Sequence, residues 1–345
     1  MDPYLSIVVA ARNDNYEGDF LGRAQRFIKV LAEFQRRHAL EIELIVVEWN
    51  PPSNRARLLE ALVWPHFPNG FRLRIIEVPD EIHRNLPNAD KIALFEYLAK
   101  NVGIRRARGR FTLTTNPDVL FSEELITYLA SRRLDDHCFY RIDRYDFSGS
   151  PNPMLRPEDI LKFAKRRVFQ VHVRIDGQRQ PTIRIDNLRR LCGLWLGKWP
   201  TSYTQGSRGI RFGESAVILY DERGPYGGVH TNASGDFLLT SSENWRRIGG
   251  FPEFSDTFTH LDSYACHQLK ALGLKQILLL PPCMLLHEEH SRAQQINRPY
   301  RPNCVWEDDL KAIREGCLGP NVNGTDWGLG NQSLPEVIIG NGSSA

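Results

Sequence analysis

The stretch NVGIRRARGRFTLTTNPDVLF, Asn101–Phe121, combines the end of a helix, a buried strand and an acidic loop. Apolar residues at helical spacing upstream predict a helix over residues 90–108, and Gly109 suits the left-handed conformation that ends many helices. Phe111–Thr115 has the β-branched and aromatic content of a strand. Pro117 ends this strand because proline cannot donate to a ladder.

Asp118 directly follows the predicted strand. In open α/β sheets, ligands bind just beyond the carboxyl ends of the strands, so Asp118 is a candidate functional residue. A purely structural role is the alternative, because Asp118 also suits a turn before the next helix. That helix is predicted to begin at Ser122, whose hydroxyl can cap it.

The first half of the chain alternates strands and helices. Leu5–Ala11 and Glu43–Glu48 are continuous apolar runs, as expected for strands covered on both faces. Helices are predicted over residues 20–37 and 55–62, and a third strand over residues 72–78. Strands that alternate with crossover helices form parallel sheets. The sequence therefore predicts an α/β fold with an open, mostly parallel twisted sheet flanked by helices.

The second half changes character after about residue 147. Strands are expected over residues 138–143, 168–175, 216–220, 236–240 and 276–280, and helices over residues 157–167, 242–248 and 260–272. Residues 148–232 form a loop-rich insert, and long loops inside a globular protein usually bind something or move. We expect one domain over residues 1–318. Residues 319–345 are rich in Gly, Asn and Ser and predict a mostly flexible tail, which Trp327 would pin to the body.

Composition excludes several classes of function. The 345 residues include 44 Lys and Arg against 41 Asp and Glu, a net charge of +3, so no overall field favours nucleic acid or a membrane surface. No apolar run is long enough to span a bilayer, and no signal pattern opens the chain. These features predict a cytoplasmic protein without a transmembrane segment. The six cysteines show no CxxC pair, which favours reduced thiols over a disulfide or zinc framework.

Five segments together resemble the GT-A-fold glycosyltransferases, most closely family 2. They occur in the family's order: LSIVVAARND, LIVVEWNPPS, NVGIRRARGRFTLTTNPDVLF, SGDFLLTSSENWRRIGGFPEF and HLDSYACHQLKALGL. The resemblance covers residues 5–290, and the insert matches poorly. It implies a GT-A type sheet and transfer of a sugar from a nucleoside diphosphate donor, a UDP-sugar before a GDP-sugar, to an acceptor hydroxyl. Residues 1–147 would then bind the nucleotide, and residues 233–290 would face the acceptor.

The resemblance also implies roles for individual residues. In such enzymes the loop after the first strand and an acid ending the second cradle the nucleotide. The residues at the nucleotide-binding positions are Ala11, Arg12, Asn13, Glu48, Asn101 and Asn116. Glu48 stands where the family usually has Asp. Asn101 and the neighbouring Gly103 are also consistent with close helix packing alone.

The family's Asp-x-Asp metal motif falls on Asn116-Pro117-Asp118, so its first carboxylate is missing here. A late histidine often completes the metal site in this family, and either His287 or His290 in LLHEEHS matches it. The implied cofactor is Mn²⁺ or Mg²⁺, which a carboxylate, a histidine and the donor diphosphate would hold. Asp262 matches the general base of inverting members, although retention stays open and Asp262 also suits a helix cap.

The acceptor side is predicted from the insert and from the GGF turn, Gly249–Phe251. The residues expected to contact the acceptor are Trp195, Trp199, Glu243 and Glu253, with Tyr203 and Tyr226 as further aromatic faces. Packing in the core is the alternative for the tryptophans, and solvation for the two acids. The charge-dense run FYRIDRYD, which begins at Phe139, is interpreted as an internal ion-pair network rather than a catalytic group.

Two other functions remain open from the sequence. A nucleotide-sugar-binding or glycan-binding protein that has lost catalysis is favoured by Asn116, which replaces a carboxylate. A nucleotidyltransferase on a similar sheet is the second alternative. It is disfavoured because no Gly-rich phosphate loop with a following Lys lies near the first strand.

Overall fold

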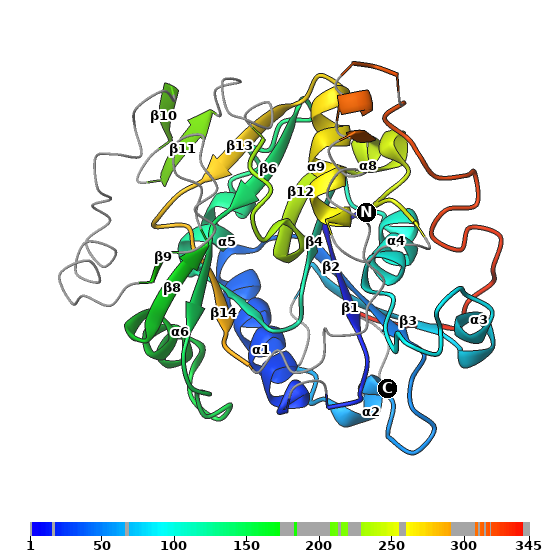
Figure 1. The fold of residues 1–345 in the computed structure, drawn as a ribbon. Helices are drawn as coiled ribbons and strands as arrows, with labels where there is room; N and C mark the ends of the chain where they lie inside the picture. The colour runs from blue at the N-terminus through cyan, green and yellow to red at the C-terminus, as the bar shows by residue number, and fades with distance from the viewer. Residues whose placement is uncertain are drawn as a thin grey trace.

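A computed structural model gives the structure of the protein (Figure 1). It describes residues 2–15, 18–65, 69–172, 183–184, 208–212, 215–219, 229–254, 260–290, 308–309, 311–313, 315–317 and 319–340. Side chains are not described over residues 171–228. The largest element is a ten-stranded sheet with the order β10-β11-β13-β6-β12-β4-β1-β2-β3-β15. A five-stranded sheet has the order β5-β14-β7-β8-β9.

Four parallel strands form the centre of the large sheet. They are β1 (Leu5–Ala11), β2 (Ile42–Trp49), β3 (Phe71–Val78) and β4 (Phe111–Thr115). β4, β1, β2 and β3 are neighbours in that order, and every pair is parallel. Side chains of β1, β2 and β4 are buried throughout because helices cover both faces. The predicted α/β class, an open and mostly parallel sheet flanked by helices, is confirmed.

Antiparallel strands extend this centre on both sides. β12 (Phe237–Ser241) lies between β4 and β6 (Cys138–Ile142) and is antiparallel to both. β13 (Lys275–Leu279) runs parallel to β6, and β11 (Ser215–Leu219) and β10 (Arg208–Phe212) follow it. At the other edge, β15 (Glu336–Ile339) pairs antiparallel with β3.

Alternate residues of β1 pack against different layers of helices. Ile7 belongs to a core with α1 (Phe20–His38) and α5 (Glu123–Ala130), while Val8 belongs to a second core with α4 (Glu96–Arg106), α8 (Ser242–Ile248) and α9 (Leu261–Ala271). The helices therefore cover opposite faces of the sheet (Figure 1). α4 packs so closely that a Cβ on Gly103 would lie 2.4 Å from Cγ1 of Val8. Glycine is required there for packing.

The smaller sheet contains four strands that the sequence did not predict: β5 (Val119–Phe121), β7 (Arg144–Phe147), β9 (Ile183–Arg184) and β14 (Leu285–Glu288). The predicted strand β8 (Val168–His172) completes it. Short helices lie at α2 (Leu58–Ala61) and α3 (Asp80–Arg84), and α6 is Pro157–Arg166. The predicted helix over residues 90–108 begins only at Glu96. α3 was not predicted.

Residues 319–340 lie against the body, which differs from the mostly flexible tail expected from their composition. Trp327 is 7% exposed, and the guanidinium of Arg105 lies 5.2 Å from its ring. Arg106 donates hydrogen bonds to the carbonyls of Gly328 and Leu329. Two basic side chains at the end of α4 thus help to hold this segment, whose Trp327 packs into the core beside α4. Across the described residues, no helix has both the length and the apolar character needed to cross a bilayer.

Candidate metal centre and active site

The register of the smaller sheet brings together residues that are far apart in sequence. β14 lies between β5 and β7, with His287 opposite Val119 on one side and Asp146 on the other. The backbone N–H of Glu288 donates to the carbonyl of Asp118, 3.3 Å away. Asp118 itself lies just beyond the carboxyl end of β4. The strand pairing therefore places His287 next to Asp118.

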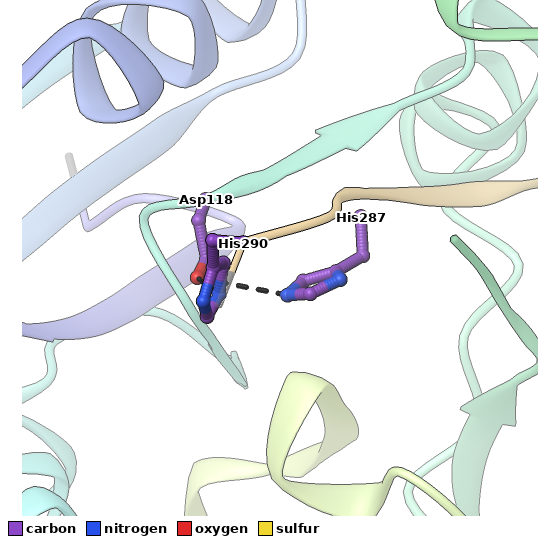
Figure 2. Close-up of side chains that lie close together, drawn as sticks. All are labelled: Asp118, His287 and His290. Carbon is purple, nitrogen blue, oxygen red and sulfur yellow. Dashed lines mark hydrogen bonds and ion pairs between the residues drawn. The ribbon is translucent and has the colours of Figure 1, made fainter. Parts of the chain in front are cut away.

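Asp118, His287 and His290 form a compact cluster (Figure 2). The Nε2 atom of His290 lies 3.2 Å from Oδ2 of Asp118, and Nε2 of His287 lies 3.7 Å from the same oxygen. One ligand-type atom from each side chain lies within 4.8 Å of the others. Both imidazoles thus face one carboxylate, and the three donor groups converge on a small region.

The electrostatics of this cluster reflect its burial. Burial alone would raise the pKa of Asp118, but hydrogen bonds and charge from His287 and His290 outweigh it and hold that pKa well below its usual range. Burial alone would lower the pKa of His287, but the carboxylates of Asp118 and Asp146 raise it to about 9. Without another cation, the cluster therefore favours an ionised carboxylate beside a protonated imidazole.

The donor set fits a divalent cation. Oδ1 of Asp118 is buried and has no hydrogen-bond partner among the residues that the structure describes, although buried polar atoms are rarely left unpaired. A cation shared with the two imidazoles would satisfy this oxygen. Imidazole nitrogen suits first-row transition metals better than it suits Mg²⁺, which prefers oxygen ligands. Of the two predicted ions, Mn²⁺ fits this mixed set better.

Asp262 lies at the same edge of the large sheet as Asp118. Its Oδ2 accepts two hydrogen bonds of 2.7 Å, from Oγ of Ser234 and from the backbone N–H of Gly235. The turn η2 (Ser234–Asp236) leads directly into β12, whose Phe237 pairs with Thr115 at the carboxyl end of β4. The structure thus places the predicted base and the predicted metal ligand at one edge of the fold.

The residues predicted to cradle the nucleotide also lie at this edge. Ala11 and Glu48 are paired at the ends of β1 and β2. Arg12 donates from Nε to the carbonyl of Asn50 at 2.7 Å, and Asn13 donates from Nδ2 to the carbonyl of Ala56 at 2.9 Å. Oδ1 of Asn13 is buried and has no hydrogen-bond partner among the described residues.

Glu48 is buried at the end of β2 and accepts the backbone N–H of Leu58 at 3.0 Å. Burial raises the pKa of Glu48 to about 7, above its ordinary value of 4.5. The folded state therefore holds this proton more tightly than the unfolded state does. The stability that Glu48 contributes is fully present below pH 4.5 and is lost as the pH rises through about 7.

Glu48→Gln is expected to remove this pH dependence, because glutamine does not titrate and its amide oxygen can still accept from Leu58. The free energy of unfolding of the variant, relative to the unchanged protein, should be higher at about pH 8 than at about pH 5. Denaturant unfolding at the two pH values measures the difference. If the difference in unfolding free energy between the two proteins is the same at both pH values, the raised pKa of Glu48 is contradicted.

No protein-family model matches the sequence, and no curated protein matches it. One similar solved structure is a crystal structure of GalNAc-T7 with UDP, GalNAc and Mn²⁺. The TM-score is 0.46 and the sequence identity 11%, over 90% of this chain and 50% of that chain. This chain thus matches only half the length of that one. So distant a likeness carries no argument about the activity.

Two residues predicted to bind nucleotide use their side chains within the protein. Asn101 donates from Nδ2 to the carbonyl of Phe251 and to Glu253, and its Oδ1 accepts the N–H of Phe251. It fixes the GGF turn rather than facing a ligand. Asn116 accepts a 2.7 Å hydrogen bond from Lys100 and donates a 2.7 Å hydrogen bond to Asp236. Its amide therefore joins two buried charges.

The predicted acceptor residues are not brought together. Glu243 is exposed at the start of α8, which follows the end of β12 that pairs with Phe111. That end is the opposite edge of the sheet from Asp118, so Glu243 cannot contact an acceptor there. Glu253 accepts from Asn101 and from the N–H of Gly328, which ties it to the C-terminal segment. Trp195 and Trp199 lie outside the described residues, as do Tyr203 and Tyr226.

The run that begins at Phe139 contains a buried ion network, as the sequence suggested. Arg144 pairs with Asp146 and Asp236 at 2.9 Å and 2.8 Å. Sequence reasoning did not assign Asp146, Asp236 or Lys100 to the site. The only signal for Asp146 was the density of charge in this run, which indicates a buried network without showing what it surrounds. Lys100 on α4 and Asp236 in η2 lie outside the run and carried no such signal.

Proposed function

We propose that this protein is a metal-dependent glycosyltransferase of the GT-A type. It would transfer a sugar from a nucleoside diphosphate donor to an acceptor hydroxyl. A UDP-sugar is the favoured donor. The observation that carries this proposal is the convergence of Asp118, His287 and His290, with Oδ1 of Asp118 lacking a hydrogen-bond partner within the described part of the chain. This cluster lies at the carboxyl edge of parallel strands, where ligands of open α/β sheets bind.

The chemistry that this site must support is the departure of a nucleoside diphosphate, which builds negative charge on phosphate oxygens. A divalent cation held by Asp118, His287 and His290 would supply the neutralising charge. The loops after β1 and β2 would hold the nucleotide, with Oδ1 of Asn13 accepting an N–H of the base. Residues 1–147 would thus form the donor side of the site, and residues 233–290 the acceptor side.

Asp262 is the proposed general base of an inverting displacement. Its Oδ2 is held by Ser234 and Gly235, so the orientation of the carboxylate is fixed before the acceptor arrives. A hydroxyl is a poor nucleophile until a carboxylate within hydrogen-bond reach takes its proton. The position of Asp262 at the edge that also carries Asp118 supports this role.

The test is to incubate the full chain with a panel of UDP- and GDP-sugars, Mn²⁺ and hydroxyl acceptors, and to follow nucleotide release. Asp262→Asn is expected to lower the transfer rate about 10²-fold to 10⁴-fold, because the amide cannot take a proton. Asp136→Asn is the matched control, since this exposed carboxylate pairs only with Arg110 among the described contacts. Full activity of the Asp262 variant would exclude it as the base.

A nucleotide-sugar-binding protein without catalysis is the second candidate. It is favoured by Asn116, which replaces a carboxylate of the family's metal motif and is bonded to Lys100 and Asp236. A missing carboxylate would weaken metal binding at the diphosphate. Thermal stabilisation by UDP and Mn²⁺, with no nucleotide released from any donor sugar, would support this candidate over transfer.

A further inference from the structure

His287 makes a second contact, on the side of its ring away from Asp118. Its Nδ1 lies 3.1 Å from Oδ1 of Asp146. Both residues occupy paired positions of parallel strands, since His287 on β14 is opposite Asp146 on β7. An ionised carboxylate only accepts hydrogen bonds. Nδ1 of His287 therefore carries the hydrogen, and Nε2 is left to face Asp118.

Asp146 is itself held in place by Arg144. Nη2 of Arg144 donates to Oδ2 of Asp146 at 3.3 Å, and the amide of Gln170 donates to the same oxygen at 3.1 Å. Nη1 of Arg144 donates to Oδ2 of Asp236 at 2.8 Å. The side chains of Arg144, Asp146 and Asp236 are each at least nine-tenths buried. The carboxylate that contacts His287 is thus fixed on both of its oxygens.

We propose that Asp146, held by Arg144, is a positioning residue that orients His287 as a metal ligand. The inference rests on the proposed function only in taking Asp118, His287 and His290 as a metal site. Metal-bound histidines usually donate their other ring N–H to a carboxylate or carbonyl, which fixes the tautomer and the ring orientation. Here the carboxylate comes from β7, the neighbouring strand, and needs no loop to place it.

A purely structural ion network is the alternative for these residues. Arg144 joins Asp146 and Asp236, and such a network could simply hold β7 against the turn before β12. The two roles differ in what a substitution changes. A structural role lowers the melting temperature and leaves the metal affinity of the folded protein unchanged, whereas a positioning role changes the affinity and the electronic spectrum of the bound metal.

The experiment measures metal binding by the full chain without any sugar donor. Mn²⁺ is titrated by calorimetry, and Co²⁺ is used as a spectroscopic probe of the ligand geometry. Asp146→Ala is expected to weaken Mn²⁺ binding about 10-fold to 100-fold and to alter the Co²⁺ absorption bands. Asp146→Asn should lose less Mn²⁺ affinity, because its amide oxygen can still accept a hydrogen bond from Nδ1 of His287. Asp159→Ala, which removes an exposed carboxylate on α6, is the matched control.

Arg144→Met provides a second variant, because it leaves Asp146 in place and removes the group that holds it. Arg144→Met should also weaken Mn²⁺ binding, as Asp146→Ala does. If Asp146→Ala does not fold, the Mn²⁺ affinities of Asp146→Asn and Arg144→Met decide the test, and melting curves show whether each of these variants is folded. Unchanged Mn²⁺ affinity and unchanged Co²⁺ spectra in the folded variants would overturn the proposal.

The outcome is independent of whether the protein transfers a sugar. If the protein without substitutions binds Mn²⁺ but releases no nucleotide, the proposed transferase activity is refuted. The positioning role of Asp146 then still stands if its variants bind the metal more weakly. If the protein without substitutions binds neither Mn²⁺ nor Co²⁺, the positioning role of Asp146 is overturned, because His287 would then bind no metal.

Discussion

Asp118→Ala is expected to lower metal-dependent nucleotide release about 10²-fold to 10³-fold, the cost of removing one stabilising group from the charge that develops during reaction. The substitution removes the only carboxylate of the cluster and leaves two neutral imidazoles to hold the cation. The measurements are the rate of nucleotide release at saturating donor and the Mn²⁺ affinity. Both should fall together, because one side chain serves both.

Asp118→Asn sharpens this test, since it keeps the size of the side chain and removes the charge. Its effect should lie in the same direction as that of Asp118→Ala. Melting temperatures measured without metal distinguish a lost ligand from a misfolded protein. A folded Asp118→Ala variant with full activity and full Mn²⁺ affinity would discard the metal site and the mechanism that depends on it.

Arg26→Ala is expected to destabilise the protein by about 3–5 kcal/mol, the cost of breaking a buried salt bridge by removing one partner. The side chain of Arg26 on α1 is 2% exposed, and that of Glu288 on β14 is 4% exposed. Nε and Nη2 of Arg26 donate to the two oxygens of Glu288 at 2.9 Å and 2.7 Å. Removing Arg26 would leave a buried, unpaired carboxylate next to His287. Denaturant unfolding measures the loss.

The double variant Arg26→Met with Glu288→Leu tests this explanation. Apolar side chains of similar size need no partner, and replacing both members of a buried pair is often neutral or stabilising by about 1–4 kcal/mol. The double variant should therefore be more stable than Arg26→Ala. A double variant as unstable as the single one would show that packing, rather than the unpaired charge, sets the loss.

The centre of the fold was predictable because its signals are local. Leu5–Ala11 is apolar at every position, and a strand of this kind must be covered on both faces. Ser122 was predicted to cap a helix, and its Oγ accepts the N–H of Leu125 at the start of α5. In each case a few neighbouring residues determine the local structure.

The smaller sheet was not predictable for the opposite reason. β14 follows two prolines and holds two charged or titratable residues in four, so its sequence does not resemble a buried strand. It becomes one because β5 and β7 pair with its two edges. These pairings join residues more than a hundred positions apart. The resemblance named His287 and His290, but Asp146 could be found only from the strand register.

The pairing of β15 with β3 has a consequence for self-association. β3 is eight residues long, and five of its side chains are apolar. Without β15, its outer row of backbone N–H and C=O groups would be open, and such an edge is a template for pairing with another chain. Four residues near the C-terminus, from Glu336 to Ile339, cover part of it. β15 then forms the edge of the sheet itself, so a four-residue edge replaces an eight-residue one, and very short edge strands are one way in which proteins limit edge-to-edge pairing.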